Sequence, residues 1–210
     1  MKVAPSILTA NFIRLEDELK SIEEGSDYVH VDVMDGHFVP NISFGPAIVS
    51  QIGELTKLPM DIHLMVEHPL DWIDKVIFPT TEFITIHAEC NRFKESIRRI
   101  LYLGKKAGLA IKPSTDVDFI KPYLDQLDLV LVMGVEPGYG GQLFIQNQLK
   151  KIEQLAKLKE ENGYRYEIQV DGGINVSTAK QVKEAGATIV VAGTFIFNYE
   201  DRKERIASLK

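Results

Sequence analysis

The stretch Val29-His30-Val31-Asp32-Val33-Met34-Asp35-Gly36 alternates valines with polar residues and a methionine, and it ends at a glycine. Side chains alternate between the two faces of a β-strand, so His30, Asp32 and Met34 share one face while the valines share the other. A valine face suits packing against helices. We therefore expect a strand in the wall of a barrel, with its polar face turned into the barrel interior.

On both sides of this stretch, short β-rich apolar runs alternate with amphipathic helical segments. The expected strands are 3–6, 28–34, 59–65, 83–87, 109–112, 129–135, 166–171 and 188–192. The expected helices are 12–22, 47–55, 70–78, 93–103, 117–124, 144–161, 178–185 and 201–209. Eight such units predict an α/β fold, a single-domain (β/α)8 TIM barrel with parallel strands that spans residues 1–210. The main alternative is an open doubly wound sheet, but no Gly-x-Gly-x-x-Gly follows the first strand.

The composition and net charge of the chain argue against some classes of binding partner. The chain has 210 residues, a formal net charge of -6 and no long block of Lys or Arg, which argues against nucleic acid or an anionic membrane as partner. It contains one cysteine, Cys90, so no intramolecular disulfide can form. No apolar run is long enough to span a bilayer, and no secretory leader is visible. We expect a cytoplasmic protein.

A second strand repeats the polar pattern. Asp61-Ile62-His63-Leu64-Met65 places Asp61 and His63 on one face, and Asp171 ends the seventh expected strand. Active sites of such barrels lie at the carboxyl ends of the strands. Buried imidazoles and carboxylates are costly unless they are paired or bind a metal. Two imidazoles and two carboxylates that converge there predict a site for one Zn²⁺, Fe²⁺, Mn²⁺ or Co²⁺ per chain. The alternative is a set of separate core polar groups, each satisfied by its own hydrogen bonds.

Three glycine-containing loops follow strands six, seven and eight, where barrels of this kind often bind phosphate. Glycines let backbone N–H groups approach an anion closely, and the alternative is that they only form tight turns. The first of the three loops also has the composition of a mobile lid. The loop residues concerned are Gly138, Tyr139, Gly140, Gly141, Gly172, Gly173, Gly193 and Thr194. We expect them to hold the phosphate group of a small phosphorylated substrate.

Several motifs together resemble one known family. They are Pro5-Ser6-Ile7-Leu8, the run His30–Asn41 (HVDVMDGHFVPN), His63-Leu64-Met65, Val135–Gln142 (VEPGYGGQ) and Val170–Ile174 (VDGGI). In this order, and nearly from end to end, the chain resembles the ribulose-phosphate 3-epimerases. The long motif on the second strand is the most specific of them.

The resemblance implies an isomerase of carbohydrate metabolism, the pentose phosphate pathway, that interconverts D-ribulose 5-phosphate and D-xylulose 5-phosphate with a bound metal. It implies that His30, Asp32, His63 and Asp171 are the metal ligands. Asp32 and Asp171 would also be the catalytic acid/base pair, one on each face of the sugar. The implied substrate contacts are Ser6 and His63, with Met34, Met65 and Met133 as an apolar cap over the reacting carbon. We also expect a homo-oligomer.

Physical chemistry supports this reaction for such residues. Inverting a carbon beside a carbonyl requires removing a proton from one face and returning one to the other, which two carboxylates can do through an enediolate. A metal stabilises the charge that develops on the enediolate oxygens. Methionines suit an intermediate that changes shape, because their side chains are flexible and polarizable.

Three positions depart from the pattern of the resembled family. Lys112 stands where many relatives have asparagine, Gly134 where threonine or serine is usual, and Thr194 where serine is common. Gly134 bears on the floor of the pocket, and so on substrate preference. His87 on the fourth strand is a candidate neighbour of the site, and His37 is expected at the outer rim.

Three alternative functions remain open at this point. The first is 3-epimerisation of a related ketose phosphate such as D-allulose 6-phosphate. The second is a Schiff-base aldolase with Lys112 as nucleophile, which leaves the His and Asp residues unexplained. The third is a non-catalytic sugar-phosphate sensor, which the two aspartates argue against.

Overall fold

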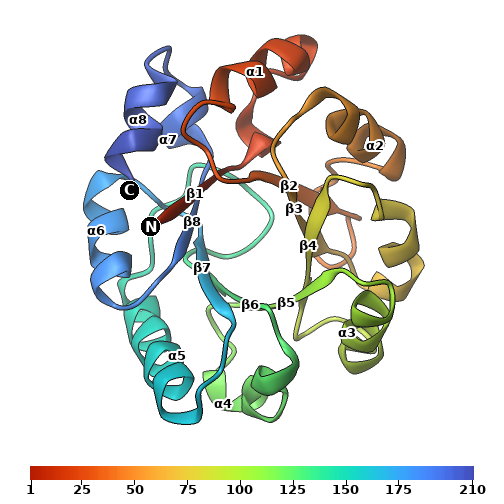
Figure 1. The fold of residues 1–210 in the computed structure, drawn as a ribbon, viewed down its shortest axis with the longest axis vertical. Helices are drawn as coiled ribbons and strands as arrows, with labels where there is room; N and C mark the ends of the chain where they lie inside the picture. The colour runs from red at the N-terminus through yellow and green to blue at the C-terminus, as the bar shows by residue number, and fades with distance from the viewer.

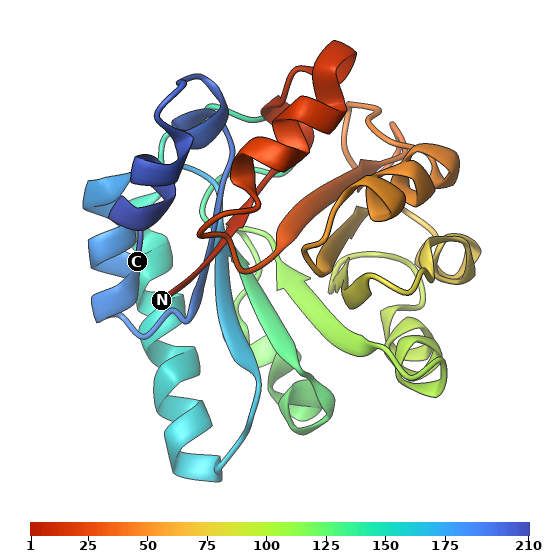
Figure 2. The same ribbon diagram turned by 45° about the horizontal axis from the view of Figure 1, so that its top comes forward.

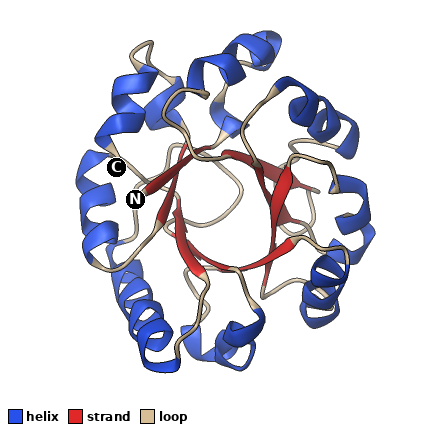
Figure 3. Cartoon of the chain, viewed as in Figure 1, coloured by secondary structure: helices blue, strands red, loops and turns tan.

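The computed structural model describes all 210 residues, and its eight strands form a ring inside an outer ring of helices (Figure 3). All neighbouring strands pair in parallel, in the order β1-β8-β7-β6-β5-β4-β3-β2. Between β1 and β2 a single bridge joins Ser6 and His30 and completes the ring. The strands are β1 (Lys2–Pro5), β2 (Val29–Met34), β3 (Met60–Met65), β4 (Thr81–His87), β5 (Lys106–Ile111), β6 (Leu129–Met133), β7 (Glu167–Asp171) and β8 (Ile189–Ala192). The predicted (β/α)8 barrel is confirmed.

The helices surround the barrel in chain order (Figure 1), and the view in Figure 2 shows them alongside the strands. They are α1 (Leu15–Ile22), α2 (Pro46–Leu55), α3 (Phe93–Tyr102), α4 (Val117–Ile120), α5 (Leu149–Asn162), α6 (Val176–Glu184), α7 (Thr194–Phe197) and α8 (Arg202–Ser208). Short 3₁₀ helices are η1 (Ile7–Thr9), η2 (Phe12–Arg14), η3 (Pro69–Asp71), η4 (Ile73–Val76), η5 (Lys121–Gln126) and η6 (Gln146–Gln148). None of the helices is both long and apolar enough to cross a lipid bilayer.

The alternation along β2 sorts its side chains as expected. Its three valines are fully buried in the large core that joins the strands to the helices. On the inner face, the register with β3 pairs His30 with Asp61, Asp32 with His63, and Met34 with Met65. The inner face therefore presents three successive polar or sulfur-containing rows that climb toward the carboxyl end of the barrel.

A separate apolar cluster fills the rest of the barrel interior. Its nine buried members are Ala4, Tyr28, Phe83, Ala110, Leu129, Leu131, Met133, Ile189 and Val191. Such layers of side chains make the interior a packed core rather than a pore. Access to the polar rows of β2 and β3 is therefore from the carboxyl end, where the βα loops lie.

Two of the expected helices are wholly or partly 3₁₀ helix in the structure. Segment 70–78 forms two 3₁₀ turns, η3 and η4, rather than one α-helix. Ile73 and Val76 are fully buried as the pattern required, but a spacing of three residues fits a 3₁₀ turn as well as an α-helix. Segment 117–124 changes from α4 to η5 at Lys121, just before Pro122, whose ring cannot continue the α-helical hydrogen bonds.

The long helix α5 begins at Leu149 rather than at Phe144. Phe144 is nearly buried, and its backbone lies so close to Gly173 that a Cβ there would be 2.3 Å from the Phe144 nitrogen. Its neighbour Ile145 donates its N–H to the carbonyl of Gly134 at 2.8 Å. Tertiary contacts thus hold this segment extended across the barrel mouth. The short helix α7 was not predicted.

Candidate active site

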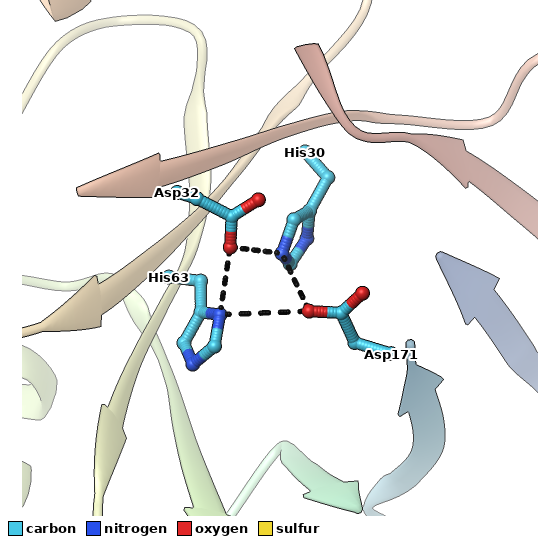
Figure 4. Close-up of side chains that lie close together, drawn as sticks. All are labelled: His30, Asp32, His63 and Asp171. Carbon is cyan, nitrogen blue, oxygen red and sulfur yellow. Dashed lines mark hydrogen bonds and ion pairs between the residues drawn. The ribbon is translucent and has the colours of Figure 1, made fainter. Parts of the chain in front are cut away.

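Four side chains from three strands meet at the carboxyl end of the barrel (Figure 4). His30 and Asp32 come from β2, His63 comes from β3, and Asp171 ends β7. One ligand atom from each lies within 4.8 Å of all the others, which is close enough for all four to hold one cation. The expected set of metal-binding residues is therefore brought together as a group that could bind a metal ion.

The four groups alternate around a square, with the two aspartates at opposite corners (Figure 4). Asp32 Oδ1 lies 3.0 Å from His63 Nδ1 and 3.3 Å from His30 Nε2. Asp171 Oδ2 lies 3.9 Å from each of the same two nitrogens. Asp171 is therefore the more loosely held carboxylate, whereas Asp32 also accepts a hydrogen bond from the Ser6 hydroxyl at 2.7 Å.

The surroundings of His30 test whether this group fits a metal ion. Its Nδ1 lies 2.7 Å from Asp61 Oδ2, which also accepts a hydrogen bond from the side-chain amide of Gln169. Its Nε2 is buried, faces the other three ligand atoms and has no hydrogen-bond partner. A carboxylate behind one ring nitrogen and an unpartnered second nitrogen are typical of a metal-binding histidine. The donor set of two imidazoles and two carboxylates fits a divalent cation.

Electrostatics separates the two aspartates. Burial alone would raise the pKa of Asp32, but His30 and His63 beside it lower that pKa well below its usual range. Burial raises the pKa of Asp171 to about 6, and the neighbouring Asp32 carboxylate adds to the rise. For His30, burial alone would lower the pKa, but Asp32 and Asp61 raise it well above its usual value. In the metal-free protein the centre therefore holds protons that a cation must displace.

We expect the affinity for a divalent cation to rise with pH from about pH 5, and to be still rising at about pH 8. Asp171 is largely protonated below pH 6, and the raised pKa of His30 keeps its imidazolium, which repels a cation, to a higher pH than that. Zinc titrations by calorimetry in buffers of different ionisation enthalpy will measure the protons released. Equal zinc affinity at both ends of this pH range, without proton release, would contradict the assignment of these ligands.

A cavity of about 260 Å³ opens above the four residues. Asp32 and Asp171 line it, whereas His30 and His63 are fully buried beneath its floor. The remaining expected substrate contacts all line it: Ser6, Met34, Met65, Met133, Gly138, Tyr139, Gly140, Gly141, Gly172, Gly173, Gly193 and Thr194. His63, which was also expected to touch substrate, does not line the cavity.

The three glycine loops meet on one side of this cavity. A Cβ at Gly193 would lie 2.8 Å from Thr9 Oγ1, and one at Gly140 would lie 2.6 Å from Thr9 Cγ2. Gly173 has a φ of +69°, which side-chain-bearing residues rarely adopt. Backbone atoms rather than side chains therefore line this end of the cavity. Thr9, which sequence reasoning missed, contributes a buried hydroxyl without a hydrogen-bond partner there.

The loop after β6 is fastened across the mouth of the barrel. The Tyr139 hydroxyl donates to the Pro40 carbonyl at 3.0 Å, and the Asn41 side-chain amide donates to the Gly138 carbonyl at 2.8 Å. The Gln142 amide bonds two carbonyls within the loop. These bonds join the β2 and β6 loops over the two aspartates. Movement of this loop as a lid stays a prediction.

A second histidine lies directly behind His63. The Nε2 atoms of His63 and His87 are 2.9 Å apart, and His87 Nδ1 is 3.2 Å from Glu89 Oε2. Burial lowers the pKa of His87 to about 4. Burial would raise the pKa of Glu89, but hydrogen bonds, chiefly from His87, lower it to about 2. Sequence reasoning placed His87 near the site but missed Glu89, whose only signal was its spacing of two residues from His87.

The three residues that depart from the pattern of the resembled family lie in different positions relative to the cavity. Gly134 does not line the cavity, and its N–H donates to the Asp171 carbonyl at 2.6 Å. A Cβ there would lie 2.5 Å from the Gly172 carbonyl oxygen, so a larger residue requires a local shift. The Lys112 ammonium lies 3.8 Å from the centre of the Phe38 ring and outside the cavity. Thr194 begins α7 and lines the cavity.

Comparison with known proteins adds the family context. A family model described as the ribulose-phosphate 3 epimerase family matches residues 2–197. A ribulose-phosphate 3-epimerase of Bacillus subtilis is 45% identical over 100% of this chain and 98% of its own length. One from Synechocystis is 44% identical over 99% of this chain and 92% of its own length.

Solved structures show the likeness in fold alone. Orotidine 5'-phosphate decarboxylase from Pyrococcus horikoshii superposes with a TM-score of 0.70 over 99% of this chain and 96% of its own, at 16% identity. Identity this low carries the barrel architecture and says nothing of the reaction.

Proposed function

Because the chain belongs to the ribulose-phosphate 3-epimerase family, we propose that it inverts C3 of D-ribulose 5-phosphate to give D-xylulose 5-phosphate. One observation carries this proposal. Two carboxylates, Asp32 and Asp171, face one cavity from opposite corners of a four-residue group that can hold a cation. We propose residues 1–210 as one catalytic domain, acting within the pentose phosphate pathway.

His30, Asp32, His63 and Asp171 would hold one divalent cation, namely zinc, iron, manganese or cobalt. Such an ion would supply positive charge beside the carbonyl oxygen that becomes negative when the C3 proton leaves. When the second proton of His30 is displaced, Asp61 keeps the remaining hydrogen on Nδ1, which leaves Nε2 with a lone pair toward the centre. The chain's own contribution is thus a buried set of ligands in which His30 is held in one tautomer.

The two aspartates would act as the acid/base pair. A ketose lying between them presents one face of C3 to Asp32 and the other to Asp171. One carboxylate removes the proton, an enediolate forms, and the other carboxyl group returns a proton to the opposite face. Transfer between the two faces requires that one carboxylate is ionised while its partner carries the proton to be given. The reverse reaction exchanges the two roles.

The remaining cavity residues would orient the sugar. Met34, Met65 and Met133 supply an apolar, deformable wall beside the reacting carbon and keep water from it. The Ser6 hydroxyl, already bonded to Asp32, is placed to contact both the carboxylate and a substrate oxygen.

We assign the phosphate to the glycine loops after β6, β7 and β8. The first N–H groups of a helix have no partner within the helix, and α7, which has no side-chain cap, begins beside this part of the cavity. A side chain at Gly173 would strike Phe144 and one at Gly193 would strike Thr9, so only backbone lines the cavity at these two positions. The overall negative charge of the chain makes local binding of this kind necessary.

Removal of the substrate phosphate is expected to lower kcat/KM by at least about 10²-fold, because remote binding energy orients the reacting carbon. The measurement compares ribulose with ribulose 5-phosphate on metal-reconstituted protein. Gly193→Ala should raise KM for the phosphorylated substrate about tenfold, whereas Gly45→Ala, whose Cβ meets nothing within 4 Å, should not. Equal turnover of both sugars would refute the assignment of the loops.

The same assay separates the competing functions. Faster turnover of D-allulose 6-phosphate than of ribulose 5-phosphate would move the substrate to the hexulose. Borohydride trapping of Lys112 with a ketose phosphate would favour a Schiff-base aldolase, and absence of any turnover would favour a sugar-phosphate sensor. The position of Lys112 outside the cavity, over the Phe38 ring, argues against the aldolase.

We further propose a homo-oligomer that acts in the cytoplasm. Ile13 and Leu143, in the loops after β1 and β6, are 95% and 91% exposed, and burial against a second copy would remove both from water. The single cysteine is buried and free, which fits a reducing compartment. Light scattering of the purified protein tests the oligomer, and a monomer at micromolar concentration would contradict it.

A further inference from the structure

His63 has two ring nitrogens in two different environments. Nδ1 belongs to the four-residue group, and the second nitrogen points away from it (Figure 4). That second nitrogen, Nε2, lies 2.9 Å from Nε2 of His87, with both rings fully buried and nearly stacked. Two nitrogens at this distance share one hydrogen, so one ring must donate and the other must accept.

The direction of this hydrogen bond follows from Glu89. An ionised carboxylate only accepts hydrogen bonds. Glu89 Oε1 already accepts two, one from the backbone N–H of Lys112 and one from the hydroxyl of Thr115. Its other oxygen faces His87 Nδ1, which must therefore carry a hydrogen. A neutral His87 then has its lone pair on Nε2 and accepts the hydrogen of His63 Nε2. A neutral His63 then has its lone pair on Nδ1, which lies 3.0 Å from Asp32 Oδ1 on the side of the four-residue group where a cation would bind.

We propose that Glu89, acting through His87, is a positioning residue that keeps the hydrogen of His63 on Nε2 and so frees Nδ1 to bind the cation. This inference rests on the metal-binding role assigned to His63 in the proposed function. Glu89 does not line the cavity, so it acts on the centre only through these two rings. The arrangement parallels His30, whose Nδ1 has Asp61 directly behind it.

The loop that satisfies Glu89 is itself anchored. The nearly buried Lys151 places its ammonium 3.1, 2.8 and 2.7 Å from the carbonyl oxygens of Lys112, Pro113 and Thr115. These bonds hold the two donors against Glu89 Oε1 and leave only Oε2 for His87. The direction of the whole chain of hydrogen bonds is therefore set by fixed backbone.

Glu89→Gln reverses this chain of hydrogen bonds with almost no change in shape. A glutamine has a single acceptor oxygen, and the two donors of the anchored loop retain it. Its NH₂ group then faces His87 Nδ1, which must accept, so His87 carries its hydrogen on Nε2. His63 must accept that hydrogen on Nε2 and keeps its own on Nδ1, where it blocks the cation.

The test measures zinc affinity and histidine tautomers separately from activity. By competition with a chelator, Glu89→Gln should bind zinc about 10–100-fold more weakly than the wild type. The matched control is Glu167→Gln at the opposite end of the barrel. The Glu167 side chain is 26% exposed, compared with 22% for Glu89, and it pairs with Lys2, which is not part of the four-residue group. Its zinc affinity should stay within about twofold of the wild type.

Imidazole ¹⁵N NMR of the wild type tests the same inference, and this measurement does not depend on whether the Glu89→Gln variant folds. With zinc and without it, hydrogens are expected on His87 Nδ1 and on His63 Nε2, so that the hydrogen between the two Nε2 atoms belongs to His63. In Glu89→Gln that hydrogen is expected on His87 Nε2. Unchanged zinc affinity in Glu89→Gln, or a wild-type hydrogen on His87 Nε2, would overturn the inference. If the wild type bound no zinc, the proposed metal site would fail, while the tautomers in the metal-free protein would still decide the role of Glu89.

Discussion

Asp171→Asn, loaded with metal, is expected to lower kcat for ribulose 5-phosphate by about 10²–10⁴-fold, the usual contribution of a general acid or base. The amide can neither accept the C3 proton nor return one. Asp171 is the more loosely held carboxylate, and burial raises its pKa to about 6. Asp32→Asn should lower kcat to a similar extent. Each variant removes one face of the two-sided proton transfer, so one of them can still exchange the C3 hydrogen of one epimer.

The control for these variants must separate chemistry from metal loss. Zinc content per chain is measured first, because both residues are also proposed ligands. Asp128→Asn serves as the matched variant, because this half-buried aspartate accepts a backbone hydrogen bond from Ala107 at the opposite end of the barrel. It should retain near wild-type kcat. A metal-loaded Asp171→Asn protein with wild-type kcat would show that Asp171 is not an acid/base residue.

Removal of the cation is expected to reduce epimerisation by about 10³-fold, because several kcal/mol of charge stabilisation are lost at the substrate oxygens. Chelation followed by dialysis, and then addition of zinc, iron, manganese or cobalt, should restore activity at one ion per chain. His63→Ala should lose both zinc and activity, whereas the exposed His68 can be replaced by Ala without either loss. Full activity of protein shown to be metal-free by elemental analysis would contradict the role of the centre.

The fold and the four-residue group were predictable because both follow from the period of a strand. Alternation along β2 placed His30 and Asp32 on the inner face, and the same rule placed His63 on β3. Asp171 followed from its position at the end of β7. These are local patterns, and the parallel barrel brings the strand ends together whatever the loops do.

The features that the sequence did not predict depend on contacts between distant segments. Phe144 has the apolar spacing of a helix, but its packing against Gly173 keeps it in a loop until α5 begins at Leu149. Glu89 follows β4 as one acidic residue among many, and only the positions of His87 and the loop anchored by Lys151 give it a role. A sequence period carries no information about such partners.

In the proposed mechanism, two carboxylates on opposite sides of the sugar exchange their protons with water. Incubation of zinc-reconstituted protein with ribulose 5-phosphate in D₂O, followed by NMR of the products, tests it most directly. We expect xylulose 5-phosphate with deuterium at C3, because the proton added to one face comes from a group other than the one that removed it. Xylulose 5-phosphate that retains the substrate's own hydrogen at C3 would contradict it, because one base would then have carried the same proton between the two faces.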